Sequence, residues 1–200
     1  MEIVDRIRDL GWQGVVGNTD EMLFRPESLE EFASQSSAPH SLWAAIRQMA
    51  AATRAILGDE RIAWLRRLPR VQMQAPMALV HSSPESLWRA PAPEATDAEL
   101  ESVYGPLGQP IAVYAHIHCP YIRKVPSSQV RKRLVVNTGS VSLSYDGDPR
   151  ASYLLLDGSA PMIRRVEYDV DKEVKALSSC GLPHADWIAR TLLAASPQIP

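Results

Sequence analysis

Residues 111–123 read IAVYAHIHCPYIR, and this stretch decides how the rest of the chain is interpreted. Its apolar, β-branched first half is bounded by glycine and proline residues, which predicts a buried strand. His116 and His118 follow at the carboxyl end, where ligands bind in open α/β sheets. On an extended strand both side chains would face one site, whereas a turn between them would make them diverge. The pair could bind a metal or hydrogen-bond locally within a loop, and so short a motif alone favours the loop.

Two other strand-like runs also end in residues that could bind a metal. Residues 15–20 read VVGNTD and close on Asn18, and residues 77–84 read MALVHSSP and close on His81. Amide oxygen and imidazole nitrogen together suit a hard-to-borderline divalent ion. The three runs therefore indicate a metal site more strongly than any one of them alone.

In this order the three runs resemble the motifs of the calcineurin-like metallophosphoesterases, in particular a small bacterial branch of phosphodiesterase-type enzymes. Residues 134–141 (LVVNTGSV) and 146–153 (DGDPRASY) resemble the closing Asn-Pro-Gly-Ser hairpin region of that branch. The resemblance extends over nearly the whole chain. It implies an α/β (α+β) fold, a four-layer αββα sandwich of two mixed β-sheets flanked by helices, formed as one domain over residues 1–200.

The resemblance also implies a site. Asn18, His81 and His116 would bind one divalent metal, and His118 would belong to a second metal. These four residues would form the catalytic centre, in which a metal-bound hydroxide attacks phosphorus. The expected cofactor is a divalent transition metal such as Mn, Fe, Zn or Ni. The expected substrate is a small-molecule phosphodiester or phosphomonoester.

The sequence departs from the family pattern in two ways. The family's remaining ligands come from an Asp-x-His on its first strand and a Gly-Asp on its second, and this sequence contains neither upstream of Asn18. We therefore expect an incomplete dimetal site, missing N-terminal strands, uncovered apolar faces and, as a consequence, a homo-oligomer or a reading frame that starts upstream. The second departure is Thr19, where many relatives carry a histidine that can protonate the leaving group. Threonine cannot do so at neutral pH, so Thr19 is expected only to contact substrate.

A local basic cluster follows the histidine pair, and it contains Arg123, Lys124, Arg131, Lys132 and Arg133. Two interpretations are open. In the ordinary interpretation these residues lie on a solvated hairpin. In the more specific one they attract an anionic phosphate. Under the second interpretation Arg123 is a candidate substrate-binding residue.

Periodicity and turn residues predict the remaining elements. Residues 21–40 should be an irregular connection or lid, and Trp88 should anchor a proline-rich loop. His40 and His184 should be surface or capping residues rather than ligands. The expected helices are 1–10, 41–57, 59–67, 97–104, 171–177 and 183–195, and the further expected strands are 14–16, 71–74, 77–80, 134–136, 152–157 and 162–168.

Composition narrows the class of protein. The 200 residues carry 21 Lys+Arg and 23 Asp+Glu, a net charge of −2, so no global field argues for nucleic acid or an anionic membrane as partner. Two cysteines rule out a disulfide framework and fit a reducing cytosol. The charged first residues are not a signal peptide, and residues 102–122 are too broken by proline and glycine for a membrane span. We therefore expect a cytoplasmic protein.

These observations favour a metal-dependent phosphoesterase. The alternative is a non-catalytic relative, a binding or scaffold protein that keeps the fold. A third class, an amide-hydrolysing metalloenzyme with His-x-His on a barrel strand, is disfavoured because no regular βα alternation follows the pair.

Overall fold

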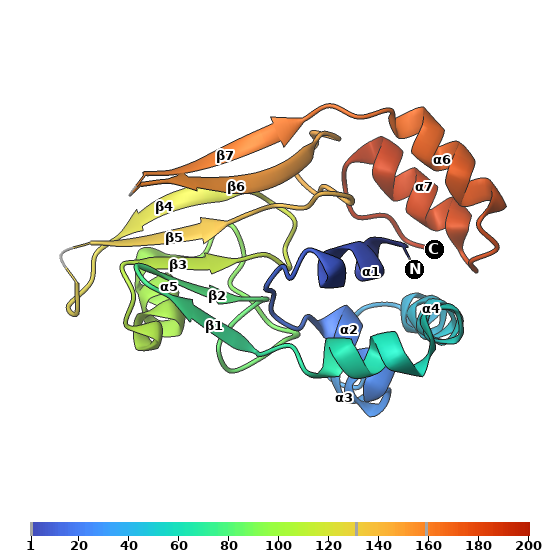
Figure 1. The fold of residues 1–200 in the computed structure, drawn as a ribbon, viewed down its shortest axis with the longest axis horizontal. Coiled ribbons are helices and arrows are strands. Elements are labelled where there is room, and N and C mark those ends of the chain that lie inside the picture. Colours follow the sequence, from blue (N-terminus) through green and yellow to red (C-terminus); the bar gives the residue numbers. More distant parts are fainter. Residues whose placement is uncertain (1, 131, 159) are drawn as a thin grey trace.

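The protein is described by a computed structural model covering residues 2–130, 132–158 and 160–200 (Figure 1). Its larger sheet has five strands in the order β1-β2-β3-β5-β4. Strands β2, β3 and β5 are parallel, while β1 and β4 run antiparallel to their neighbours, so this sheet is mixed. The bounds are β1 Val71–Gln74, β2 Met77–Val80, β3 Ile111–Tyr114, β4 Tyr121–Val125 and β5 Arg133–Asn137.

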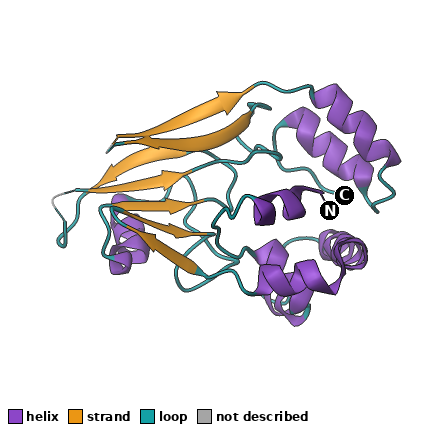
Figure 2. Cartoon of the chain, viewed as in Figure 1, coloured by secondary structure: helices purple, strands orange, loops and turns teal. Residues whose placement is uncertain are grey.

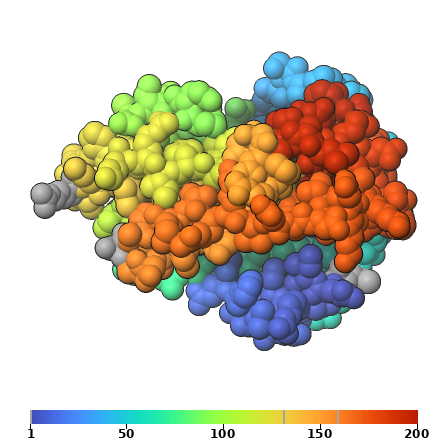
Figure 3. Space-filling model, turned by 90° about the horizontal axis from the view of Figure 1, so that it is seen from above, coloured from blue at the N-terminus to red at the C-terminus, as the bar shows by residue number. Residues whose placement is uncertain are grey.

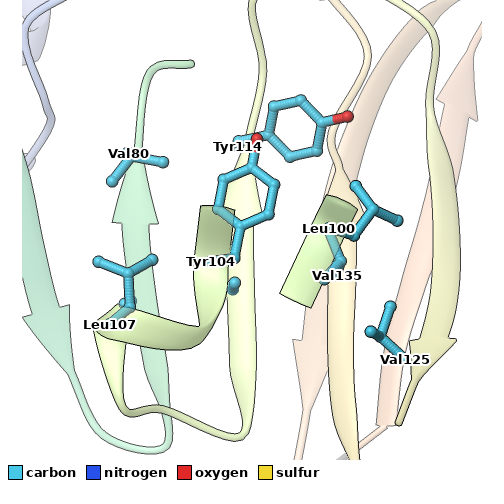
Figure 4. Close-up of a cluster of buried hydrophobic side chains, with 9 residues drawn as sticks. Val80, Leu100, Tyr104, Leu107, Tyr114, Val125 and Val135 are labelled. Atoms are coloured by element: carbon cyan, nitrogen blue, oxygen red, sulfur yellow. The ribbon is translucent and has the colours of Figure 1, made fainter. Parts of the chain in front are cut away.

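Strand β3 lies at the centre of this sheet, and all four of its residues are buried. Side chains alternate between the faces of a strand. Ala112 and Tyr114 therefore pack on one face with α5 (Asp97–Tyr104), as Figure 4 shows for Tyr114, Tyr104 and Leu100. The apolar run that predicts a buried strand forms one.

The opposite face of the sheet is covered by a second, two-stranded sheet. Strands β6 (Ala151–Asp157) and β7 (Ala160–Val166) pair in antiparallel register. Their inward side chains, Leu154, Leu156 and Ile163, pack against Ile111, Val113 and Val136 of the larger sheet. The core of the molecule therefore lies on both faces of β3.

The other helices gather at one end of the strands (Figure 2). Because β2, β3 and β5 are parallel, their carboxyl ends all point toward this end (Figure 1). These helices are α1 Glu2–Asp9, α2 Asn18–Phe24, α3 Glu27–Ala33, α4 His40–Arg66, α6 Val170–Ser179 and α7 Ala185–Ala194, and a short 3₁₀ turn, η1 Gly105–Leu107, follows α5.

Several predicted elements are confirmed. The hairpin at 71–80 is β1–β2, and Thr96 caps α5 through a reciprocal bond with Glu99. The two helices predicted on either side of Gly58 form α4, which is interrupted where Gly58 takes φ 74° and ψ 164°. The α/β class with two sheets is confirmed, although only the larger sheet is mixed and the smaller is antiparallel.

Two predicted elements are wrong. Residues 14–16, all within the described part of the chain, join no sheet, and Val16 N donates instead to the carbonyl of Pro69. Residues 21–40 were expected to be irregular, but α2 and α3 occupy most of them. Their polar composition hides two core residues, Leu23 and Leu29, which are 5% and 2% exposed.

Within the described ranges, every helix is too short or too polar to cross a membrane. Figure 3 shows β6, β7 and α6, in orange, as a band across the middle of one face of the molecule.

Candidate metal centre

Three of the predicted ligands meet at the carboxyl edge of the larger sheet. His81 follows β2, His116 lies in the turn after β3, and Asn18 is the first residue of α2. His81 Nε2 lies 2.8 Å from Asn18 Oδ1 and 3.2 Å from His116 Nδ1. Residues that are separated by up to 98 positions in sequence thus present one oxygen and two nitrogens to each other.

Metal bonds of about 2.1 Å place neighbouring donor atoms roughly 3.0–3.4 Å apart in octahedral or tetrahedral geometry. The His81–His116 separation of 3.2 Å lies in this range, and the Asn18–His81 separation of 2.8 Å is slightly shorter. Each of the three atoms can offer a lone pair, and a divalent cation would accept a lone pair from each. The residues present therefore fit one metal ion.

The environment keeps the imidazoles in the form that binds metals. Burial, with a smaller contribution from His116 and His118, lowers the pKa of His81 to about 4. Burial is also the main cause that lowers the pKa of His116 and the pKa of His118. At neutral pH the three rings are uncharged, and neutral imidazole is the ligand form.

His118 diverges from this group. The strand ends at Tyr114, and both His116 (φ 60°) and His118 (φ 56°) take left-handed backbone conformations in the turn that follows. His118 Nδ1 lies 2.6 Å from the carbonyl oxygen of Leu143, and its ring stacks on Tyr145 at 4.6 Å. The structure thus resolves the open question of the pair, because the chain turns between the two histidines. Strained conformations of this kind cluster at functional sites.

In the part of the chain that the structure describes, acidic and sulfur side chains do not complete a metal site. Within the described residues, no group of three or more His, Cys, Asp or Glu side chains converges on one point. The candidate site depends on the amide of Asn18 as its third donor. A second metal at His118, implied by the resemblance, has no converging partners in the described part of the chain.

The predicted substrate contacts have different surroundings. Thr19 lies next to Asn18 in the first turn of α2. The Arg123 guanidinium donates to the carbonyls of Pro93 (2.7 Å) and Ala95, and it lies over the ring of Tyr121. Arg123 therefore holds the loop before α5, and a contact with substrate stays a prediction.

The basic cluster around Arg123 is not a uniform solvated patch. Arg133 is fully buried and donates to Glu101 at 2.8 Å, so this residue belongs to the core rather than to a charged surface. Lys124 and Lys132 are exposed, and Arg131 lies outside the described residues.

Two residues that support the site were not predicted. Gly17 lies so close to the His81 ring that an added Cβ would be 3.0 Å from Cε1 and Nδ1. The carboxylate of Asp20 accepts the N–H of Gly17 at 2.8 Å and thereby fixes the loop that carries Asn18. Burial raises the pKa of Asp20, and this hydrogen bond partly offsets the effect. The Gly-Asn-x-Asp spacing contains both residues, but it does not show what they contact.

No protein-family model matches the chain. It is 27% identical over 209 residues to the uncharacterized protein MJ0912 of Methanocaldococcus jannaschii, covering 96% of this chain and 79% of that protein.

Two solved structures have a similar fold. A metallophosphoesterase from Sphaerobacter thermophilus superposes with a TM-score of 0.74 at 22% identity, covering 97% of this chain and 82% of that one. The hypothetical protein PH1004 from Pyrococcus horikoshii OT3 superposes with a TM-score of 0.77 at 17% identity, covering 98% of this chain and 80% of that one. The chain therefore has the fold of the calcineurin-like metallophosphoesterases.

Proposed function

We propose that this protein is a metal-dependent phosphoesterase that acts on small-molecule phosphoesters. One observation carries the proposal: at the carboxyl edge of the sheet, His81 Nε2 lies 2.8 Å from Asn18 Oδ1 and 3.2 Å from His116 Nδ1. The fold supports it, because a metallophosphoesterase from Sphaerobacter thermophilus has a similar fold.

The chain's own residues would hold and orient the reacting groups. Neutral His81 and His116, with Asn18, would bind Mn, Fe, Zn or Ni, since each of these ions accepts imidazole nitrogen. The bound ion would act as a Lewis acid toward a phosphoryl oxygen and lower the pKa of a water. Thr19, adjacent to Asn18, would contact the phosphoryl group through its hydroxyl. We propose that His118 belongs to a second metal position that is incomplete in this chain.

A non-catalytic binding protein with the same fold is the second candidate. The observation that favours it is the lack of carboxylate ligands: within the described residues, no Asp or Glu side chain joins the two imidazoles and the amide. Carboxylates are the ligands that hold two cations close together, so a single weakly held ion would bind a phosphate without hydrolysing it.

The test compares metal binding with turnover. The protein is stripped with a chelator, reloaded with Mn²⁺ and assayed with bis(p-nitrophenyl) phosphate and p-nitrophenyl phosphate. We expect Mn²⁺-dependent release of p-nitrophenol that His116→Ala abolishes and His184→Ala leaves intact. His184 is the control because it is a histidine outside the proposed ligand set, and its ring hydrogen-bonds with Gln48.

Metal content, measured by mass spectrometry, separates the two candidates. Retained Mn²⁺ without turnover of either ester would favour the binding protein. Metal content unchanged in His81→Ala, His116→Ala and Asn18→Ala would contradict the ligand assignment itself.

A further inference from the structure

A cavity of about 290 Å³ opens directly beside the candidate metal centre. Asn18, Thr19 and His116 form its polar side. Two of these three residues are the proposed metal ligands, so a molecule held by its phosphoryl group at the metal would extend into this space. The volume lies just below the usual range of about 300–1,000 Å³ for ligand pockets, which suits one ring system rather than a whole large ligand.

The remaining walls are apolar and aromatic. They come from six separate parts of the chain that close around the site: α2, α3, α4, the loop after β2, the loop after β5, and α7. The principal side chains are Phe32, Trp43, Ile46, Met49, Trp88 and Trp187. Flat aromatic walls beside a polar anchor select for a flat aromatic group, since offset stacking and edge contacts add to simple burial of apolar area.

The aromatic walls are held in place before any ligand arrives. Trp88 stacks on Phe32 at 5.1 Å, and its indole N–H donates to Glu21 at 2.7 Å. Trp43 meets Phe32 edge-on at 5.7 Å. The N–H of Trp187 donates to the carbonyl of Gln198 at 2.8 Å. A rigid cavity loses little side-chain freedom on binding and so favours affinity.

Trp43 differs from the other two tryptophans. Its side chain is 9% exposed, and its indole N–H has no acceptor within the described residues. The nitrogen itself is buried and does not lie on the cavity surface, so Trp43 contributes apolar ring surface to the wall.

We propose that this cavity binds a flat aromatic group of the phosphoester substrate. The proposal rests on the proposed function, because it places the phosphoryl group of the same molecule at Asn18, His81 and His116. It adds a substrate class, the aryl or heteroaryl phosphoesters, to a site otherwise defined only by its metal ligands.

The first experiment measures binding, so that it does not depend on catalysis. Phenylphosphonate and methylphosphonate carry the same phosphonate group and differ in the ring. Calorimetric titration with Mn²⁺ present should show phenylphosphonate binding about tenfold or more tighter, the size expected for burying most of a ring. No binding of phenylphosphonate, or equal affinity for both compounds, would overturn the proposal.

Filling the cavity should remove this preference. Ile46→Trp on α4 is expected to bring the two phosphonates to within about twofold of each other. Ile56→Trp is the matched control, since it makes the same change on the same helix at a residue that is 45% exposed and lies outside the cavity. A preference that survives in a folded Ile46→Trp protein would place the ring elsewhere. If that variant does not fold, Met49→Trp replaces it.

The titrations and the turnover assay together separate this proposal from the proposed function. Ring preference without turnover would refute the phosphoesterase and keep the cavity, and turnover without ring preference would do the reverse.

Discussion

At the scale of single residues, Gly17 sets the position of the His81 ring. Its φ of −106° is open to any residue, so backbone strain does not require glycine here. A Cβ would lie 3.0 Å from two ring atoms of His81, closer than ordinary van der Waals contact. We expect Gly17→Ala to push the ring aside and weaken Mn²⁺ binding by about tenfold, typical of residues that position a metal ligand.

The measurement is a calorimetric Mn²⁺ titration with thermal unfolding of the metal-free protein beside it. Gly14→Ala is the control, because an added Cβ at Gly14 meets no atom within 4 Å. Equal Mn²⁺ affinities for the two variants would show that the position of His81 does not depend on Gly17.

Arg133 is the second residue whose role is set by its surroundings. It is fully buried, donates to Glu101 and also reaches the carbonyls of Gln109 and Gly105. Arg133→Met should lower the free energy of unfolding by about 3 kcal/mol or more, because it leaves polar groups without their partner. Lys132→Met, an exposed neighbour, should change it by less than about 0.5 kcal/mol in the same urea titration. A similar decrease in the free energy of unfolding for Arg133→Met and Lys132→Met would contradict the burial of Arg133.

The same pair predicts a pH dependence. Burial alone would raise the pKa of Glu101, but the hydrogen bonds donated by Arg133 and Ser127 outweigh it and bring the pKa below its ordinary value. A depressed carboxyl pKa stabilises the fold above the unfolded pKa, and this stabilisation is lost as the pH falls through the folded pKa. Glu101→Gln should therefore lose less stability than the unmodified protein between neutral and acidic pH. Parallel stability curves for the two proteins would refute this.

For single residues, the sequence predicts which residues form the candidate site better than it predicts what each of them contacts. Asn18, His81 and His116 are predicted from three separate motifs, and the structure brings them together. The divergence of His118 is not predictable, because it depends on a left-handed turn that histidine adopts only when tertiary contacts, here Leu143 and Tyr145, hold it.

At the scale of elements, Gly58 divides α4. Its φ of 74° and ψ of 164° belong to a region that only glycine occupies readily. No atom crowds an added Cβ, so the backbone itself is the reason for glycine. Gly58→Ala should cost about 1–3 kcal/mol in urea unfolding, whereas Gly14→Ala should be close to neutral. An unchanged midpoint in Gly58→Ala would mean that α4 can straighten at no cost.

The elements also show where sequence patterns stop being informative. The segment 41–57 is predicted correctly because its apolar spacing covers several turns, and the short helix 97–104 because a capping residue precedes it. Helices α2 and α3 have seven residues each, too few for a period to emerge from a polar background. Residues 14–16 have strand composition but no neighbouring strand to pair with, so composition alone misleads there.

At the scale of the whole molecule, the outer face of the β6–β7 sheet has no cover in the isolated chain. Its outward side chains include four large apolar residues that are 38–49% exposed: Tyr153, Leu155, Met162 and Val166. Leu155 and Met162 are directly paired across the two strands. Contiguous exposed apolar residues mark interaction surfaces, and these strands lie in the orange band on the surface in Figure 3.

We expect a second copy of the chain to cover this face, which would form the predicted homo-oligomer through a self-complementary contact. A net charge of −2 gives little repulsion between copies.

Sedimentation velocity should show a sedimentation coefficient that rises with protein concentration. Leu155→Lys combined with Met162→Lys should hold the protein as a monomer, because the contact would then bring like charges together. Leu193→Lys, at a leucine that is 57% exposed on α7, should leave the association unchanged. The prediction fails if the unmodified protein stays monomeric at every concentration. It also fails if the Leu193→Lys control dissociates as readily as the double variant, because the β6–β7 face would then not be the contact.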